Sequence, residues 1–292
     1  MRYVCCADLH LRPDKPPCRT ESPEEWVDNQ LRKLSFILEF AANHSAQVLI
    51  AGDVCHRATG WPSWFFARVI ATFKAWPVSV FVTPGQHDLP YHQLSQLKRS
   101  NLGVLLEAGA VVDNMRGVAG FAWGEDIQQE EASDAVLAVA HLMVLKSKKD
   151  AAYPGQVELA AMAKDLLKRF PEYDLVVTGD NHQPFAEKYR RQWLVNPGSM
   201  TRQRTTETHT PGFYFYEDGN VERVILPHDP NVVTDAHQHQ PAAAAWAGDL
   251  DAVAEMLDTV EGGEELNFMS ALMAYFRERK TRAEVQKKIL GG

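Results

Sequence analysis

Short apolar runs that end in polar residues dominate the pattern of this chain. A β-branched and aliphatic run bounded by glycine or by polar residues is typical of a buried strand. Five such runs lead directly into possible ligands: Asp8-Leu9-His10, Gly52-Asp53, Gly85-Gln86-His87-Asp88, His141 and Gly179-Asp180-Asn181-His182. The pattern therefore predicts buried strands that deliver carboxylate, amide and imidazole groups into loops.

The order of the expected elements indicates an α/β fold. In the first half, strands at 2–7, 47–51, 78–82 and 136–140 alternate with helices at 22–43, 61–75, 93–101 and 125–134. Short strands are also expected at 110–113 and 118–122, and a helix at 156–170. From 174 onward strands dominate, at 174–178, 185–189, 192–195, 213–217 and 220–226. Alternation favours parallel β-α units, and the later strands favour antiparallel hairpins.

The composition changes after the last expected strand. We interpret residues 1–228 as one domain, the segment 229–247, rich in Pro, His, Gln and Ala, as a linker, and 248–292 as a helical region. The apolar stripe of this last region is short and contains Met, which suits either packing on the domain, capping of DNA or docking on a partner.

Charge and cysteine content narrow the class of protein. The net charge of −8 over 292 residues argues against a generally basic nucleic-acid-coating surface, so any DNA contact must be local or helped by cations. No apolar run approaches the ~18–20 residues of a membrane helix, and we see no signal peptide. Four cysteines, Cys5, Cys6, Cys18 and Cys55, are expected to be reduced and mostly buried. These features favour a cytoplasmic protein without membrane contact.

The ligands at the strand ends suit two divalent ions. Loops at the carboxyl ends of parallel strands gather in one crevice, so residues far apart in sequence can meet there. Seven O and N donors fit a pair of ions better than one. Two ions lower the pKa of a bridging water and neutralise phosphate oxygens, which indicates phosphoester hydrolysis. The expected ligands are Asp8, His10, Asp53, Gln86, His141, Asp180 and His182.

Three neighbouring residues are candidates for catalysis. His87 adjoins a ligand and is expected to stabilise the phosphoryl transition state or to protonate the leaving oxygen. Asp88 is expected to orient His87 or another group of the loop. His56, three residues past Asp53, could contact the substrate phosphate.

These motifs, in this order, resemble those of the calcineurin-like metallophosphoesterase superfamily over residues 1 to about 200. Asn196-Pro197-Gly198-Ser199, followed by Arg202, further resembles SbcD-type DNA repair nucleases, in a bacterial- or phage-like short form. The resemblance implies a four-layer α/β/β/α sandwich and manganese-dependent exonuclease and endonuclease activity. It also implies an SbcC-type, SMC-like ATPase partner and a homodimer formed through helices near 63–75 and 93–101.

The chain departs from the family pattern at two positions. Gln86 replaces the usual Asn, and Asp180 replaces the usual first His of the last motif. By the family pattern both changes fall on the second ion, which would be bound by Asp53, Gln86, His141 and Asp180, and the first by Asp8, His10, Asp53 and His182. An added carboxylate favours Mn²⁺ or Mg²⁺ over Zn²⁺, so we expect weaker or more manganese-dependent occupancy of that site.

The sequence does not decide between several classes of substrate. A DNA role would use a local basic patch and the motif after the last metal loop, although a solvated hairpin explains the patch equally well. Two other functions are possible: a phosphatase or phosphodiesterase acting on small molecules or proteins, and a non-catalytic scaffold with a degraded site. The expected DNA-binding residues are Arg190, Arg191, Asn196, Ser199, Arg202 and Arg204.

Overall fold

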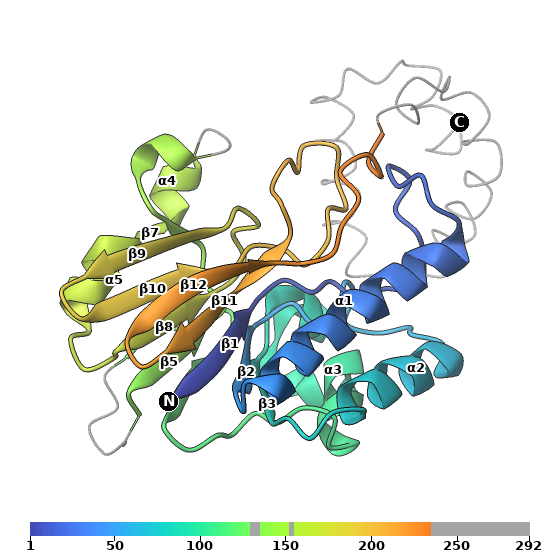
Figure 1. Cartoon of the computed structure of the whole chain (residues 1–292), viewed down its shortest axis with the longest axis horizontal. Helices are drawn as coiled ribbons and strands as arrows, with labels where there is room; N and C mark the ends of the chain where they lie inside the picture. The colour runs from blue at the N-terminus through green and yellow to red at the C-terminus, as the bar shows by residue number, and fades with distance from the viewer. Residues whose placement is uncertain (129–134, 152–154, 235–292) are drawn as a thin grey trace, which may run out of the picture. The chain divides into compact units, whose positions relative to one another are not determined.

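Two five-stranded sheets lie face to face in the computed structural model, which describes residues 1–128, 135–151 and 155–234 (Figure 1). The first sheet has the order β12-β11-β1-β2-β3 and the second the order β4-β5-β8-β10-β9. In the first sheet β1 (Arg2–Cys6), β2 (Gln47–Ala51) and β3 (Val80–Thr83) are parallel, whereas β11 (Gly212–Glu217) and β12 (Asn220–Ile225) are antiparallel additions.

The second sheet is built in the same way. β4 (Val118–Phe121), β5 (Leu137–Ala140), β8 (Leu175–Thr178) and β10 (Gln192–Asn196) are parallel, and β9 (Phe185–Tyr189) runs antiparallel to β10. The expected helix-strand alternation and the later hairpins β9-β10 and β11-β12 are therefore confirmed.

The two-residue period of the strands separates the layers. Val4 and Cys6 of β1 pack toward the helices, and Cys5 packs between the sheets with Val139 of β5. A strand with an apolar side chain on each face must be covered on both sides. This is why the strand sequences are continuously apolar and not alternating.

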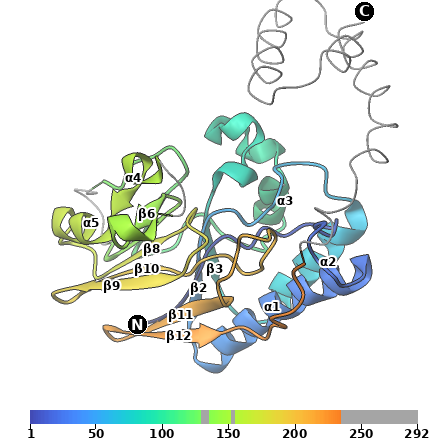
Figure 2. The ribbon, with the colours of Figure 1, turned by 90° about the horizontal axis from the view of Figure 1, so that it is seen from above.

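Helices complete the outer layers, as Figure 2 shows from above. α1 (Pro23–Asn43), α2 (Ser63–Lys74) and α3 (Asn101–Glu107) cover the first sheet, and α5 (Ala163–Arg169) covers the second. Ser22 starts α1 with a capping box: its hydroxyl accepts the Glu25 N–H, and the Glu25 carboxylate accepts the Ser22 N–H. The predicted four-layer α/β/β/α sandwich is confirmed.

Several predicted elements differ in detail. The helix expected at 93–101 is a 3-10 helix, η3 (Leu94–Arg99), because Ser100 caps a separate helix, α3, by accepting the Gly103 N–H at 2.9 Å. The helix expected at 156–170 is broken into α4 (Gln156–Leu159) and α5, because β7 (Ala161–Met162) between them pairs with β6 (Val144–Leu145). Only an isolated bridge between Phe81 and Val112 forms in the strand expected at 110–113. Residues 125–128 are not helical, and the rest of that predicted helix lies outside the described residues.

The described start of the predicted linker returns to the first domain. Thr234 donates its N–H to the Cys18 carbonyl at 2.8 Å, and Val233 pairs with Arg19. The described part of the chain thus continues past residue 228 to residue 234, and the helical region predicted for 248–292 lies outside the described residues. All four cysteines are buried and free, as predicted. Among the described helices, none has the length and apolar character needed to cross a bilayer.

Candidate active site

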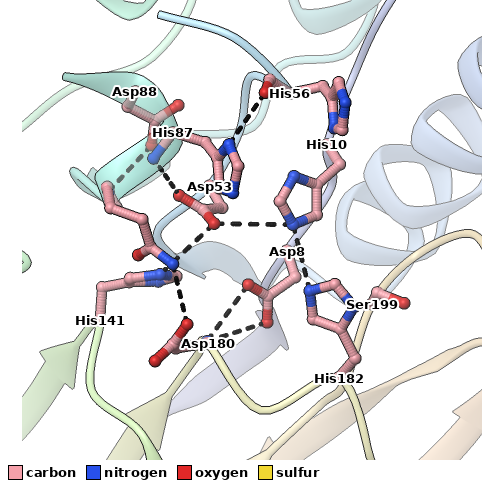
Figure 3. A network of polar contacts seen from close by, with 12 residues as sticks. Asp8, His10, Asp53, His56, His87, Asp88, His141, Asp180, His182 and Ser199 are labelled. Atoms are coloured by element: carbon pink, nitrogen blue, oxygen red, sulfur yellow. Dashed lines mark hydrogen bonds and ion pairs between the residues drawn. The ribbon is translucent and has the colours of Figure 1, made fainter. Parts of the chain in front are cut away.

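The carboxyl ends of five parallel strands bring the expected ligands together (Figure 3). The loops after β1, β2, β3, β5 and β8 supply them, so both sheets contribute to one site. The site opens into a cavity of about 570 Å³ that is lined by the buried Glu207 and the exposed Arg204, whereas Asp8 and His141 are fully buried and do not line it. Other lining residues are His10, Asp53, His56, Gln86, His87, Asp180 and His182.

One group of ligands surrounds the space between β1 and β8. Nε2 of His10 and Nε2 of His182 face each other at 3.1 Å, and Asp8 lies within reach of both as a third ligand. Nδ1 of His182 lies 2.6 Å from a carboxylate oxygen of Glu207. A carboxylate on the far nitrogen of an imidazole fixes the tautomer and the orientation that metal binding needs. This group matches the ligand set predicted for the first ion, with Asp53 as its fourth member.

Asp53 lies between this group and the next. Its Oδ2 is 3.6 Å from Nε2 of His10 and 3.5 Å from Nε2 of His141, so one oxygen faces both ligand sets. Nδ1 of His141 donates to the Ala51 carbonyl at 2.8 Å, which leaves Nε2 as the ligand atom. Asp53 is therefore placed to bridge two cations.

Gln86 and Asp180 complete the second group. The Gln86 amide nitrogen donates to Asp180 Oδ1 at 2.8 Å, while Gln86 Oε1 is buried without a hydrogen-bond partner. A buried acceptor without a partner costs free energy unless a cation or water satisfies it. The substitution of Gln for the usual Asn keeps an amide oxygen as a possible donor, although the amide nitrogen is the atom that faces Asp180. The donor set therefore fits two divalent ions.

The backbone of the ligands is strained. Asp8, His10, Asp53 and Asp180 all have positive φ, at 50°, 44°, 51° and 78°. Left-handed backbone is unfavourable for residues with a Cβ and is retained where the surrounding structure imposes it, often at functional sites. Four such residues in one cluster indicate that the surrounding structure imposes this ligand geometry, although the backbone conformation of each residue is locally unfavourable.

Two motif glycines allow the loops to approach each other. A Cβ on Gly85 would collide with the carboxylate and the backbone of Asp53, and a Cβ on Gly52 would collide with the His141 ring. Gly52 also has a φ of 76°. The glycines of the predicted motifs are thus needed for close packing of ligand against ligand.

Burial and charge act together on the ligands. Burial raises the pKa of Asp8 to about 7. Although burial alone would lower the pKa of His141, the neighbouring Asp53 carboxylate raises it to about 10. The protein thus holds carboxylates and imidazoles in a poorly hydrated cluster, where bound cations would compensate the negative charge.

A family model described as the calcineurin-like phosphoesterase superfamily domain matches residues 1–218. The chain belongs to this superfamily. Its members use divalent ions to hydrolyse phosphoesters, which agrees with the paired ligand sets around Asp53. No curated protein matches the chain significantly.

The solved structures that match this phosphoesterase are distant from it in sequence. An archaeal phosphodiesterase is 14% identical over 77% of this chain and 100% of its own, with a TM-score of 0.42. A calcineurin-like phosphoesterase from Bacillus subtilis is 12% identical over 77% and 88%, with a TM-score of 0.43. Vacuolar Protein Sorting 29 from Cryptosporidium parvum is 15% identical over 77% and 95%, with a TM-score of 0.32.

In this phosphoesterase, His87 and His56 form one wall of the cavity. Their rings are parallel, with centroids 5.7 Å apart. His87 Nδ1 lies 3.0 Å from the His56 carbonyl, so the hydrogen bond between them leaves Nε2 of His87 for a substrate. Nε2 of His56 accepts from Arg12 at 2.9 Å, and burial together with Arg12 lowers the pKa of His56 to about 4. His56 is therefore neutral at pH 7, and its proposed phosphate contact stays a prediction.

Asp88 lies beneath this wall and is fully buried. Its carboxylate accepts the backbone N–H groups of Val54, Cys55 and Gly85 at 2.8 to 3.2 Å. These contacts tie the loop after β2 to the loop after β3. Asp88 is thus a positioning residue, the second of the two roles expected from the sequence.

The structure argues against direct DNA contact for two of the six predicted residues, Asn196 and Ser199. Asn196 is fully buried and donates to the carbonyls of Asn181 and Gln183, so it holds the last metal loop in place. Ser199 is also buried, against His209. A buried side chain cannot reach a phosphate, so the prediction of direct DNA contact is wrong for both residues.

The predicted arginines are dispersed. Arg190 and Arg191 form the turn before β10, whereas the metal loops follow the other end of the parallel strands; Arg191 pairs with Asp174 at 3.3 Å. Arg202 donates to the carbonyls of Asp229 and Pro230. Only Arg204 lines the cavity. The sequence could not show which of these arginines lies at the cavity, because residues that are close along the chain can be far apart in the folded protein.

Sequence reasoning missed Glu207 and Arg12. Glu207 reaches His182 from 25 residues further along the chain, and Arg12 reaches His56 from 44 residues away. A lone Glu or Arg in a loop carries no local signal of such a contact. Arg12 lies two residues after the first metal motif, and this position was the only sign in the sequence that it could contribute to the site.

Proposed function

We propose that this phosphoesterase is a manganese-dependent DNA nuclease that hydrolyses phosphodiester bonds, as an exonuclease or endonuclease in repair or recombination. The observation that carries the proposal is the placement of the Asp53 carboxylate between two ligand sets, with the His87 imidazole on the adjoining wall. Two ions at these ligand sets would supply the Lewis acidity for attack on a phosphate.

The protein groups have separate tasks in this proposal. His87, whose Nδ1 is held by the His56 carbonyl, presents Nε2 to the leaving oxygen as a proton donor. Arg204, exposed on the rim, attracts the phosphate backbone electrostatically. Glu207 and Asp88 hold His182 and the loops in position. The choice of Mn²⁺, with Mg²⁺ as the nearest substitute, rests on Asp180, which gives the second ion a carboxylate where the family pattern has an imidazole.

We further propose a homodimer and an SbcC-type, SMC-like ATPase partner. Large apolar side chains are exposed along the helices expected to form the dimer: Trp64 of α2 is 50% exposed, Leu94 of η3 42% and Val104 of α3 43%. Trp61 and Phe65 of the same aromatic segment are buried in the core, so only part of it is available to a partner. Exposed apolar groups of this kind suit an interface.

A comparison of ester classes tests the nuclease proposal. The purified full-length chain with Mn²⁺ is expected to hydrolyse methyl p-nitrophenyl phosphate, a diester, and linear single-stranded DNA much faster than p-nitrophenyl phosphate, a monoester. A strong preference for the monoester would favour a phosphatase, and absence of all hydrolysis would favour a scaffold. Either result would overturn the proposal.

The His87→Ala variant tests the assigned proton donor. It is expected to lose about 100-fold or more in diester hydrolysis while retaining its metal content, because general acid catalysis contributes about 10²–10⁴-fold. His228→Ala is the matched control, since His228 is exposed and lies outside the cavity. Unchanged hydrolysis in the His87 variant would remove this residue from the mechanism.

A further inference from the structure

A second pocket of about 600 Å³ adjoins the metal cavity. The two share His56, Gln86 and His87, so the pocket opens from the wall that carries the proposed proton donor. On its far side it is lined by the 3-10 turn η2 (Pro90–His92) and by residues at the end of η3. Apart from these three shared residues, its lining lies outside the sequence motifs. Its position suits the part of a substrate next to the scissile phosphate.

An exposed aromatic side chain forms part of its rim. Tyr91 is 87% exposed, and both Tyr91 and His92 have positive φ, at 54° and 55°. Two consecutive strained residues outside the metal ligands need a reason, because an ordinary turn would place a Gly or Asn there. His92 is supported by an edge contact with Trp123, with ring centroids 5.3 Å apart. The turn therefore exposes the Tyr91 ring to solvent, while the contact between His92 and Trp123 supports the turn from the other side.

Two arginines complete the pocket. Arg57 and Arg99 both line it and are exposed. In the described part of the chain, neither guanidinium makes an ion pair or a side-chain hydrogen bond, whereas Arg12, Arg19 and Arg68 are paired with carboxylates. In a protein of net charge −8, two arginines without carboxylate partners beside the metal cavity form a local anion-attracting patch.

We propose that this pocket binds the nucleotide that flanks the scissile phosphate, with the base stacked on Tyr91 and the neighbouring phosphates contacted by Arg57 and Arg99. Aromatic stacking combined with guanidinium contacts is the usual mode of binding to single-stranded nucleic acid, and it tolerates any base. A paired base cannot offer its face to a side chain, so the pocket selects single strands and frayed ends. This inference rests on the proposed function, since it assumes a nucleic-acid diester as substrate.

The test compares oligonucleotides with and without the flanking base. Each single-stranded oligonucleotide carries one cleavable phosphate, the others being protected as phosphorothioates, and has either a normal or an abasic nucleotide on one side of it. With the full-length chain and Mn²⁺, Tyr91→Ala is expected to raise KM for the normal oligonucleotide about tenfold. On the oligonucleotide abasic at the bound side, wild type and variant should have equal KM. Tyr91→Trp should retain the wild-type KM.

Further variants separate this pocket from a general effect on folding or chemistry. Hydrolysis of methyl p-nitrophenyl phosphate, which has no base, should be unchanged in Tyr91→Ala. Leu159→Ala is the control, because it removes an exposed apolar side chain outside both pockets. Arg57→Ala with Arg99→Ala should flatten the salt dependence of oligonucleotide KM, and Arg190→Ala should not.

The outcomes distinguish the two proposals. If wild type hydrolyses neither the small diester nor DNA, the nuclease proposal fails and this inference fails with it. If wild type cleaves both but Tyr91→Ala has an unchanged KM on the normal oligonucleotide, only the stacking pocket is refuted. An equal KM increase on normal and abasic oligonucleotides would also refute it, because the effect would not depend on a base.

Discussion

Replacing Glu207 by Gln tests whether the contact behind His182 sets the strength of one metal site. The Glu207 carboxylate lies 2.6 Å from His182 Nδ1 and is only 7% exposed, so solvent screens the contact little. Although burial alone would lower the pKa of His182, the hydrogen bond that its Nδ1–H donates to Glu207 raises it, which makes the imidazole a stronger ligand. Glu207 also accepts the backbone N–H groups of Gln203 and Arg204, and a Gln carbonyl can retain part of this bonding.

The expected loss is about 10–100-fold in affinity for one ion, or about 1.4–2.7 kcal/mol, as for other carboxylate partners of metal-bound histidines. The other ion, whose ligands do not contact Glu207, should keep its affinity within about twofold. Calorimetric titration of the metal-free protein with Mn²⁺ resolves the two sites. Glu222→Gln, an exposed position on β12, is the matched control. Equal weakening of both sites, or of neither, would refute the assignment of Glu207 to the first ion.

Three other changes give independent checks. Gly85→Ala should abolish metal binding and diester hydrolysis, measured by metal analysis and turnover, because the added Cβ collides with Asp53. Asp180→His should increase Zn²⁺ occupancy of the second site; unchanged occupancy in metal analysis would contradict the role given to Asp180. Burial lowers the pKa of Lys33 from 10.5 to about 7, so stability is lost as pH falls through that window. Lys33→Met should therefore raise the free energy of unfolding by about 3 kcal/mol at pH 7 and by less than about 1 kcal/mol at pH 10 in denaturant titrations.

The sequence predicted the ligands better than their surroundings. Asp8, Asp53 and His141 each follow an apolar run, and a buried strand must place whatever follows it at the sheet edge. This logic required no knowledge of contacts between distant segments. Asn196 also stands at the end of a strand, as the last residue of β10, but it is buried and donates hydrogen bonds to the carbonyls of Asn181 and Gln183. A residue at a strand end can therefore be a ligand or a support, and local pattern does not separate the two.

The boundaries predicted for the helix at 156–170 were wrong for a related reason. The apolar period over 156–170 is compatible with one helix, but pairing of Ala161 and Met162 with β6 interrupts it. Backbone hydrogen bonds to a distant strand outweighed a weak local preference, since helix propensities differ by only a few tenths of a kcal/mol per residue. The first helix was predicted at 22–43 and is observed at Pro23–Asn43 after the Ser22 cap, because local and tertiary forces agree there.

The sequence by itself determined which residues stand at the ends of buried strands, and with them the layered fold and the donor set of the metal centre. Strand periodicity and loop chemistry act over a few residues, so they can be read directly. Tertiary structure alone decided that Glu207 supports His182, that burial and Arg12 together lower the pKa of His56, and that Tyr91, Arg57 and Arg99 border one pocket. Those choices depend on which loops meet when two sheets pack, and no short stretch of chain contains that information.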